Sequence, residues 1–237
     1  MVTRSAWQTF PPSVRGRWAR LGARVRRWLL LGRLAALRTG PLVRRAVDVA
    51  AAVAGLLAAA PLLFAAAVAI KLSSAGPVFY SQQRVGQRGR LFRLWKLRTM
   101  VHGADELKQH LLESDGLDGP RFKLERDPRI TPVGRLLRRT SMDELPQFLN
   151  VLVGDMTLIG PRPPLWSEVV EYDPRALRRL EVPPGLTCLW QVRGRSDLSF
   201  EEQVALDLEY IDRVGLLGEL RILLATIPAV LTGRGAY

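Results

Sequence analysis

The chain has 237 residues, a length typical of one domain with an appendage. Hydrophobic residues make up 48% and charged residues 24%, which excludes a disordered chain and a collagen-like repeat. A single cysteine excludes an intramolecular disulfide and a four-cysteine zinc site, and two histidines argue against a histidine-rich metal site or a Ser/His/Asp triad. Chemistry in this chain must therefore come mainly from carboxylates, arginines and backbone groups.

The formal net charge of +13 is concentrated near the N-terminus. Residues 1–45 contain eleven arginines, no lysine and no acid, whereas the other residues carry 24 basic and 22 acidic side chains. A polyanion is therefore expected to bind the first fifth of the chain, and composition leaves both nucleic acid and an anionic membrane surface open.

Residues 14–38 alternate arginines with apolar residues at helical spacing, namely Trp18, Leu21, Val25, Trp28 and Leu29. This pattern predicts a basic amphipathic helix on a membrane surface. The alternative is an arm that binds RNA or DNA. Because an apolar segment follows directly, we favour the membrane and predict that residues 1–41 form an arginine-rich amphipathic arm.

Residues 49–70 form 22 consecutive positions without a charge, bounded by Asp48 and Lys71. As a helix this segment would be about 33 Å long, enough for a hydrocarbon core of about 30 Å. A wholly buried core helix is the alternative, although a helix that is apolar all round needs a larger domain to cover it. A cleaved signal peptide is disfavoured because the segment starts late and is too long.

Pro61 lies in the middle of this segment and predicts a break or kink between Ala60 and Leu62. Proline removes a backbone donor, and its ring presses on the carbonyl of Leu57. Both flanks are basic, so the positive-inside rule gives no orientation for one span but is satisfied by a helix that returns to the same face. We therefore predict a re-entrant membrane helix at residues 42–72, with a kinked spanning helix as the alternative.

Beyond the apolar segment the chain reads as a small mixed domain. Residues 78–83 and 90–97 flank two glycines and predict a hairpin, and residues 115–120 predict a loop. Pro146 is tolerated only in a first helical turn, so a helix should begin at residues 141–143 and run through Val151. Residues 216–231 are apolar but too short to span a membrane, so they are expected in the core or at the interface.

The densest chemistry is at Asp143 and Glu144, where arginines precede two adjacent acids at the expected helix N-terminus. A carboxylate can attack phosphorus to form an acyl phosphate if cations neutralise the phosphate oxygens and a metal screens the two anions. Asp143 could then be the nucleophile and Glu144 a magnesium ligand, with Arg138 and Arg162 on a diphosphate. The alternative is that Asp143 caps the helix and Glu144 is solvated.

From about residue 42 to Tyr237 the chain resembles the bacterial sugar transferase family, the monotopic phosphoglycosyl transferases. The resemblance rests on the order and spacing of several motifs. These are GPVFYSQQRVG (76–86), KLRTM (96–100), DPRITPVG (127–134), SMDELPQ (141–147), NVLVGDM (150–156), GPRP (160–163), PGLT (184–187), WQVRGRSDLSFEE (190–202), DLEY (207–210) and GRGAY (233–237).

The resemblance implies an α+β, mostly helical fold. It implies a re-entrant helix-break-helix anchor, and a compact cytosolic catalytic domain over residues 73–237 with interfacial amphipathic helices. It places the protein in the bacterial inner membrane, with the catalytic domain facing the cytosol. The family often has Ser-Pro at the break, where this chain has Ala60 and Pro61.

The resemblance also implies an activity. Members transfer a sugar phosphate from a nucleoside-diphosphate sugar, usually a UDP-sugar, to a polyprenyl phosphate such as undecaprenyl phosphate, and release UMP. Asp143 would form the covalent phosphosugar intermediate and Glu144 would bind Mg²⁺. The basic residues expected around the phosphates and nucleotide are Lys96, Arg138, Arg162 and Arg195.

Three functional hypotheses follow for this chain. In the first, it is a membrane-bound transferase that starts exopolysaccharide, capsule or other glycan assembly, with downstream glycosyltransferases as partners and no nucleic acid. In the second, it is a catalytically degenerate scaffold of a glycan assembly complex. In the third, it is a membrane-tethered nucleic-acid binder.

Overall fold

The computed structural model describes the backbone of residues 12–104, 107, 127–194 and 197–232, and the side chains from residue 40 onward except 216 and 230–232. The predicted loop at residues 115–120 lies outside the described residues. The chain divides into two compact units, Met1–Val47 and Asp48–Tyr237. The second unit contains the hairpin, the acidic pair and the apolar segment.

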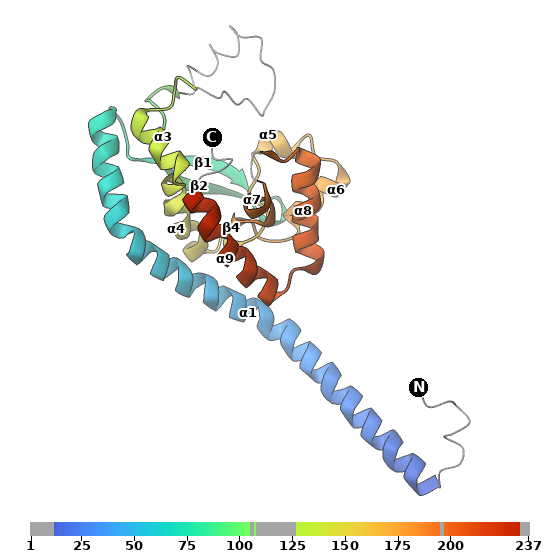
Figure 1. Cartoon of the computed structure of the whole chain (residues 1–237). Helices are drawn as coiled ribbons and strands as arrows, with labels where there is room; N and C mark the ends of the chain where they lie inside the picture. Colours follow the sequence, from blue (N-terminus) through green and yellow to red (C-terminus); the bar gives the residue numbers. More distant parts are fainter. Residues whose placement is uncertain (1–11, 105–106, 108–126, 195–196, 233–237) are drawn as a thin grey trace. The chain divides into compact units, whose positions relative to one another are not determined.

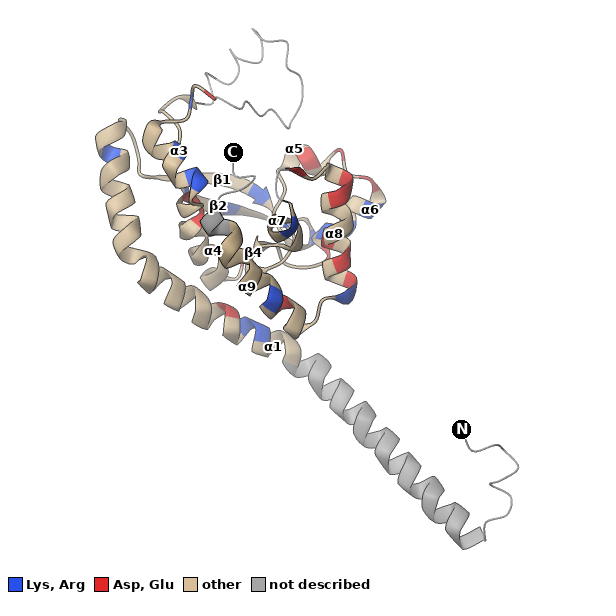
Figure 2. Ribbon diagram, in the orientation of Figure 1, with Lys and Arg blue, Asp and Glu red and all other residues tan. Residues whose placement is uncertain are grey.

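Helix α1 extends over Pro12–Ser73. Within the described residues, Gly40–Ser73 is the helical segment that is long and apolar enough to cross a membrane, and Figure 2 shows its long uncharged stretch. Helical structure continues through Pro61, and the ribbon bends where its colour passes from light blue to turquoise in Figure 1. The proline therefore gives a bend inside an unbroken helix, and the alternative of a break is wrong.

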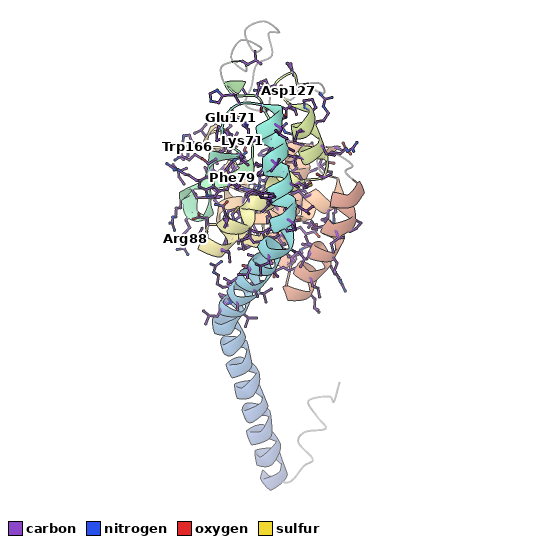
Figure 3. All side chains as sticks on the ribbon, turned by 90° about the vertical axis from the view of Figure 1, so that its left-hand side faces the viewer. Lys71, Phe79, Arg88, Asp127, Trp166 and Glu171 are labelled. Atoms are coloured by element: carbon purple, nitrogen blue, oxygen red, sulfur yellow. The ribbon has the colours of Figure 1, made fainter. Side chains whose placement is uncertain are left out.

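A hairpin follows α1, as the sequence predicts. Strand β1 (Phe79–Val85) pairs antiparallel with β2 (Leu91–Leu97), with Tyr80 opposite Lys96 and Arg84 opposite Phe92. A short 3-10 turn, η2 (Gln87–Gly89), joins the strands, and Figure 3 shows Arg88 at the outer edge of this unit. Since side chains alternate along a strand, Arg84 and Lys96 share one face of the hairpin while Arg93 lies on the other.

The rest of the unit is mostly helical, which confirms an α+β fold dominated by helices (Figure 1). A second sheet is formed by two short parallel strands, β3 (Thr157–Ile159) and β4 (Gly185–Thr187). The helices that surround the two sheets are α3 (Pro132–Arg139), η3 (Met142–Gln147), α4 (Phe148–Val153), α5 (Trp166–Val169), α6 (Pro174–Leu177), η4 (Arg178–Leu180), α7 (Leu189–Arg193), α8 (Phe200–Arg213) and α9 (Leu216–Thr232).

The apolar part of α1 packs on this unit through small residues. Ala52, Ala59 and Ala66 are buried and recur every seven positions, a spacing that keeps them on one face of the helix. Ala52 belongs to the main core cluster with β2, α4 and β3, while Ala66 joins a second cluster with Ile70 and Leu97. The opposite face of α1 is exposed, and only 17% of its most apolar stretch is buried, so the alternative of a wholly buried core helix is wrong.

Helix α9 also has two different faces. Ile222 is buried in the main core cluster, where the hydroxyl groups of Thr187 and Thr226 lie 2.8 Å apart. The predicted core position of this segment is therefore confirmed on one side. The other side exposes large apolar side chains, namely Leu217, Leu220, Leu224 and Ile227.

A buried ion pair joins η4 to α8. The Nε and Nη2 atoms of Arg179 both lie 2.8 Å from Oδ2 of Asp207, and Asp207 is fully buried. Arg179 also donates to the hydroxyl of Tyr172 and lies over the rings of Tyr172 and Phe200, at 5.6 and 5.9 Å from the ring centres. The guanidinium therefore depends on this one carboxylate and two aromatic rings for its stability in the interior.

Replacement of Asp207 by alanine should destabilise the protein strongly. The Asp207→Ala variant leaves a buried guanidinium without its counter-charge, which costs about 3–5 kcal/mol in comparable pairs. Thermal unfolding of the full chain in detergent micelles would measure the loss. The matched control is Asp212→Ala, because Asp212 pairs with the adjacent but exposed Arg178. Equal losses for the two variants would contradict this account.

Candidate active site

The acidic pair lies in a tight turn between two helices. Helix α3 ends at Arg139, Ser141 adopts a left-handed conformation (φ 55°), and η3 begins at Met142. The predicted helix start is confirmed, but the first six residues form a 3-10 helix before α4 continues. Short 3-10 turns are common at helix ends, and Pro146 has no N–H to donate. The turn places Asp143 and Glu144 at the start of a helical segment.

Asn150 holds this segment against β2. Its Oδ1 accepts a hydrogen bond from the backbone N of Trp95 at 3.1 Å, and its Nδ2 donates to the carbonyl of Arg93 at 2.6 Å. The amide thus pairs with the strand edge in place of a further strand, and it is 1% exposed. Sequence reasoning assigned no role to Asn150, although it lies inside a matching motif.

Lys96 lies between the two carboxylates. Its Nζ donates to Oε1 of Glu144 at 2.7 Å and lies 3.9 Å from Oδ2 of Asp143. Nη1 of Arg162 lies 3.8 Å from the same Oε1. Four predicted site residues from three separate segments therefore meet here.

Of the other two predicted site residues, the structure places Arg138 but not Arg195. Arg138 is half-buried near the acidic pair, its Nε donates to Oγ1 of Thr99 at 3.0 Å, and its charge lowers the pKa of Asp143. Arg138 therefore belongs to the same charged group. Arg195 lies outside the described residues.

The two neighbouring acids have opposite pKa shifts. Burial raises the pKa of Asp143 to about 6, and the negative charge of Glu144 adds to the rise, against the attraction of Lys96. Burial also raises the pKa of Glu144, but attraction by Lys96 and Arg162 and the hydrogen bond from Lys96 outweigh it, so the net shift is downward. Glu144 thus carries a lasting negative charge, while Asp143 is the more basic carboxylate.

An open pocket adjoins the acidic pair. Its lining is rich in positive and amide side chains and includes Arg84, Lys96, Glu144, Gln147, Arg162 and Gln191. Asp143 is not part of the lining, but its Oδ2 is 3.9 Å from the Lys96 ammonium that is. The cationic groups of Lys96 and Arg162 in this lining would attract an anionic group of a ligand toward the acidic pair.

The acidic pair also fits a magnesium ion shared with a substrate. Within the described part of the chain, no group of three or more Asp, Glu, His or Cys side chains gathers to hold a metal. Mg²⁺ commonly takes only one or two protein carboxylates and completes its shell with water and substrate phosphates. Glu144, with Asp143 beside it, matches this donor set.

Removal of the Asn150 amide should loosen the acidic pair and destabilise the unit. Asn150→Leu keeps the size but leaves two backbone groups of β2 without partners, at a cost of about 2–4 kcal/mol. Asn150→Asp keeps the acceptor for Trp95 and loses only the donor to Arg93, so an intermediate loss is expected. Thermal unfolding in detergent tests this order, and wild-type stability in both variants would refute it.

Comparison with known proteins places these features in a family. Residues 39–233 match the sequence model described as "Bacterial sugar transferase". Galactosyl transferase CpsE of Streptococcus agalactiae is 43% identical over 196 residues, which cover 82% of this chain and 43% of CpsE. The chain thus spans less than half of that relative's length.

Two further relatives are covered over most of their length. The exopolysaccharide production protein ExoY of Rhizobium meliloti is 41% identical over 84% of this chain and 89% of its own. The UDP-glucose:undecaprenyl-phosphate glucose-1-phosphate transferase of Caulobacter vibrioides is 42% identical over 84% of this chain and 76% of its own. The chain belongs to the bacterial sugar transferase family, a family of enzymes.

Proposed function

We propose that this enzyme transfers a sugar 1-phosphate from a UDP-sugar to undecaprenyl phosphate. The observation that carries the proposal is the Lys96 ammonium, which lies within 3.9 Å of two carboxylates of unequal basicity beside a pocket lined by arginines. A relative covered over 76% of its length is named for such a transfer from UDP-glucose. Other relatives are named for exopolysaccharide production, which supports a proposed role at the start of exopolysaccharide or capsule assembly. Downstream glycosyltransferases are the proposed partners.

In the first step, a carboxylate oxygen of Asp143 attacks the phosphorus next to the sugar. The bond from that phosphorus to the bridging oxygen breaks, the electron pair stays on that oxygen, and UMP leaves. Lys96 and Arg162 neutralise the phosphate oxygens as the two anions approach each other. The product is a phosphosugar joined to Asp143 through an acyl phosphate.

In the second step, an oxygen of undecaprenyl phosphate attacks the same phosphorus. The bond between that phosphorus and the Asp143 oxygen breaks, which restores the carboxylate and yields the sugar diphospholipid. Neither step needs a proton to be taken from the nucleophile, since both nucleophiles are anions. This agrees with a charged group built from lysine, arginine and carboxylates, without a histidine base.

Magnesium is the proposed cofactor, held by Glu144 with Asp143 beside it. When bound, it would add positive charge at the phosphates. Arg138 is proposed to contact the phosphates from the α3 side of the acidic pair. Arg195 is proposed at the nucleotide on the family resemblance alone.

The anchor is proposed to be re-entrant, and contacts at its two ends support this path. Near its start, Oδ1 of Asp48 accepts from the backbone N of Leu158 at 3.0 Å. Just after its end, Nη2 of Arg98 donates to the carbonyl of Ser74 at 2.8 Å. Both ends thus contact one catalytic unit, whereas a spanning helix would carry its ends to opposite sides of the bilayer. Because nucleotide sugars are cytosolic, the proposed location is the cytosolic face of the inner membrane.

Asp143→Asn should abolish the reaction, because an amide cannot form the acyl phosphate. Membranes or purified protein would be incubated with UDP-glucose or UDP-galactose and undecaprenyl phosphate, and UMP release measured. We expect a loss of at least about 10³-fold.

A donor labelled in the sugar phosphate provides the second readout for Asp143. Without acceptor it should leave label on the wild-type polypeptide and none on Asp143→Asn. Asp212→Asn, at an exposed position on α8, serves as the matched control and should behave as wild type. Full UMP release by Asp143→Asn would remove Asp143 from the nucleophile role.

Chelation should stop the reaction, and added Mg²⁺ should restore it. If Glu144 is a metal ligand, Glu144→Gln should raise the Mg²⁺ concentration needed for half-maximal rate by about 10-fold or more. UMP release over a Mg²⁺ titration measures this. Activity that survives EDTA, or an unchanged Mg²⁺ requirement in Glu144→Gln, would contradict the proposed role.

A further inference from the structure

A proline-rich segment carries Arg162 to the pocket. This proline strap comprises residues 160–164, in which Pro161, Pro163 and Pro164 have no backbone N–H. A segment with so few donors must be held mainly through its carbonyl oxygens. The position of Arg162 therefore depends on the donors that those carbonyls find.

The first end of the strap is fixed on β4. The backbone N of Gly185 donates to the carbonyl of Pro161 at 2.9 Å, and the N of Gly160 donates to the carbonyl of Thr187 at 3.0 Å. Gly160 and Gly185 approach so closely that a Cβ added to either would clash with the backbone of the other. This end is therefore held by direct backbone packing.

The second end is fixed by the last two residues of β1. Nη1 of Arg84 donates to the carbonyl of Pro163 at 3.0 Å, and the backbone N of Val85 donates to the carbonyl of Pro164 at 3.0 Å. Nη2 of Arg84 donates to Oε1 of Gln82 at 2.6 Å, which fixes the guanidinium itself. Arg162 thus lies between a clamp at Pro161 and a clamp at Pro163 and Pro164.

Burial of the Arg84 guanidinium costs desolvation free energy, because it removes a charge from water. Arg84 is 9% exposed, its Nε is buried without a hydrogen-bond partner, and among the described residues no carboxylate lies within ion-pair distance of it. Burial, together with the like charge of Arg162, lowers its pKa to about 10. That repulsion favours positions of Arg162 away from β1, and Arg162 lies 3.8 Å from Glu144.

We propose that Arg84 is a positioning residue, which holds the proline strap and directs Arg162 toward the acidic pair. Arg84 shares the pocket lining with Arg162 and Lys96, but its two terminal nitrogens are engaged by the strap and by Gln82. Its action is on Arg162, and through Arg162 on the donor's diphosphate. This last link rests on the proposed function.

Hydrogen exchange tests the clamp without any need for activity. In full-length Arg84→Met protein in a membrane mimetic, the amide of Val85, which donates to the carbonyl of Pro164, should exchange at least about 10-fold faster than in wild type, because the strap is released. The matched control is Arg93→Met, which removes an exposed arginine from the other face of the same hairpin. Unchanged exchange in Arg84→Met, or equal acceleration in Arg93→Met, would overturn the proposal.

Kinetics test whether the clamp acts through Arg162. Arg84→Met should raise the KM for the UDP-sugar about 10-fold or more with a smaller change in kcat, and Arg84→Lys should recover part of the loss. The double variant Arg84→Met/Arg162→Met should be no worse than Arg162→Met alone. Additive losses would show that Arg84 acts independently and would refute the mechanism.

Hydrogen exchange and kinetics distinguish a failure of the Arg84 clamp from a failure of the proposed function. A wild-type enzyme that releases no UMP with any donor would overturn the proposed function, while hydrogen exchange would still decide whether Arg84 holds the strap. If Arg84→Met does not fold, Arg84→Lys keeps the charge and most of the side-chain volume. Its single ammonium nitrogen cannot reproduce the planar fork of the guanidinium, so the Val85 amide should still exchange faster than in wild type.

Discussion

The site depends on one ammonium group that lies between two carboxylates. Asp143 and Glu144 are adjacent in sequence and poorly solvated, so they repel each other and would resist ionisation together. Lys96 approaches both and offsets that repulsion, most strongly at Glu144. The contact requires β2 and η3 to meet, which the Asn150 amide secures by pairing with the strand edge. A cluster of charges is thus held by neutral hydrogen bonds just behind it.

The same packing couples the anchor to the chemistry. Ile70 of α1 and Leu97 of β2 share a core cluster, and Leu97 follows Lys96 directly. Ala52, further along the same face of α1, joins the main cluster with Phe92 and Leu94 of β2. The strand that carries Lys96 is therefore packed on the anchor at two places. A re-entrant helix would in this way hold the acidic pair at a set depth relative to the lipid headgroups, where the phosphate of the proposed acceptor would lie.

Buried charge is distributed unevenly in the catalytic unit. Arg179 and Asp207 neutralise each other and add aromatic contacts, as expected of a structural pair. At the pocket, by contrast, Arg84 is buried without a carboxylate in contact and Asp143 has a raised pKa. A buried cation without a counter-charge reduces stability, and carboxylates with shifted pKa values are typical of functional sites. A diphosphate would meet the positive charge of Lys96 and Arg162, the latter held in place by Arg84.

Features that depend only on neighbours along the chain could be predicted from the sequence. The apolar segment, the hairpin, the helix start before Pro146 and the acidic pair with Lys96, Arg138 and Arg162 all follow from local pattern or motif. The folded structure was needed to show that α1 bends without breaking at Pro61, that Asn150 pairs with β2 and that Arg84 contacts the strap. The contacts of Asn150 and Arg84 join residues between 55 and 79 positions apart. The bend in α1 depends on the surface against which the helix packs. Local patterns carry no information about such partners, because packing alone brings them together.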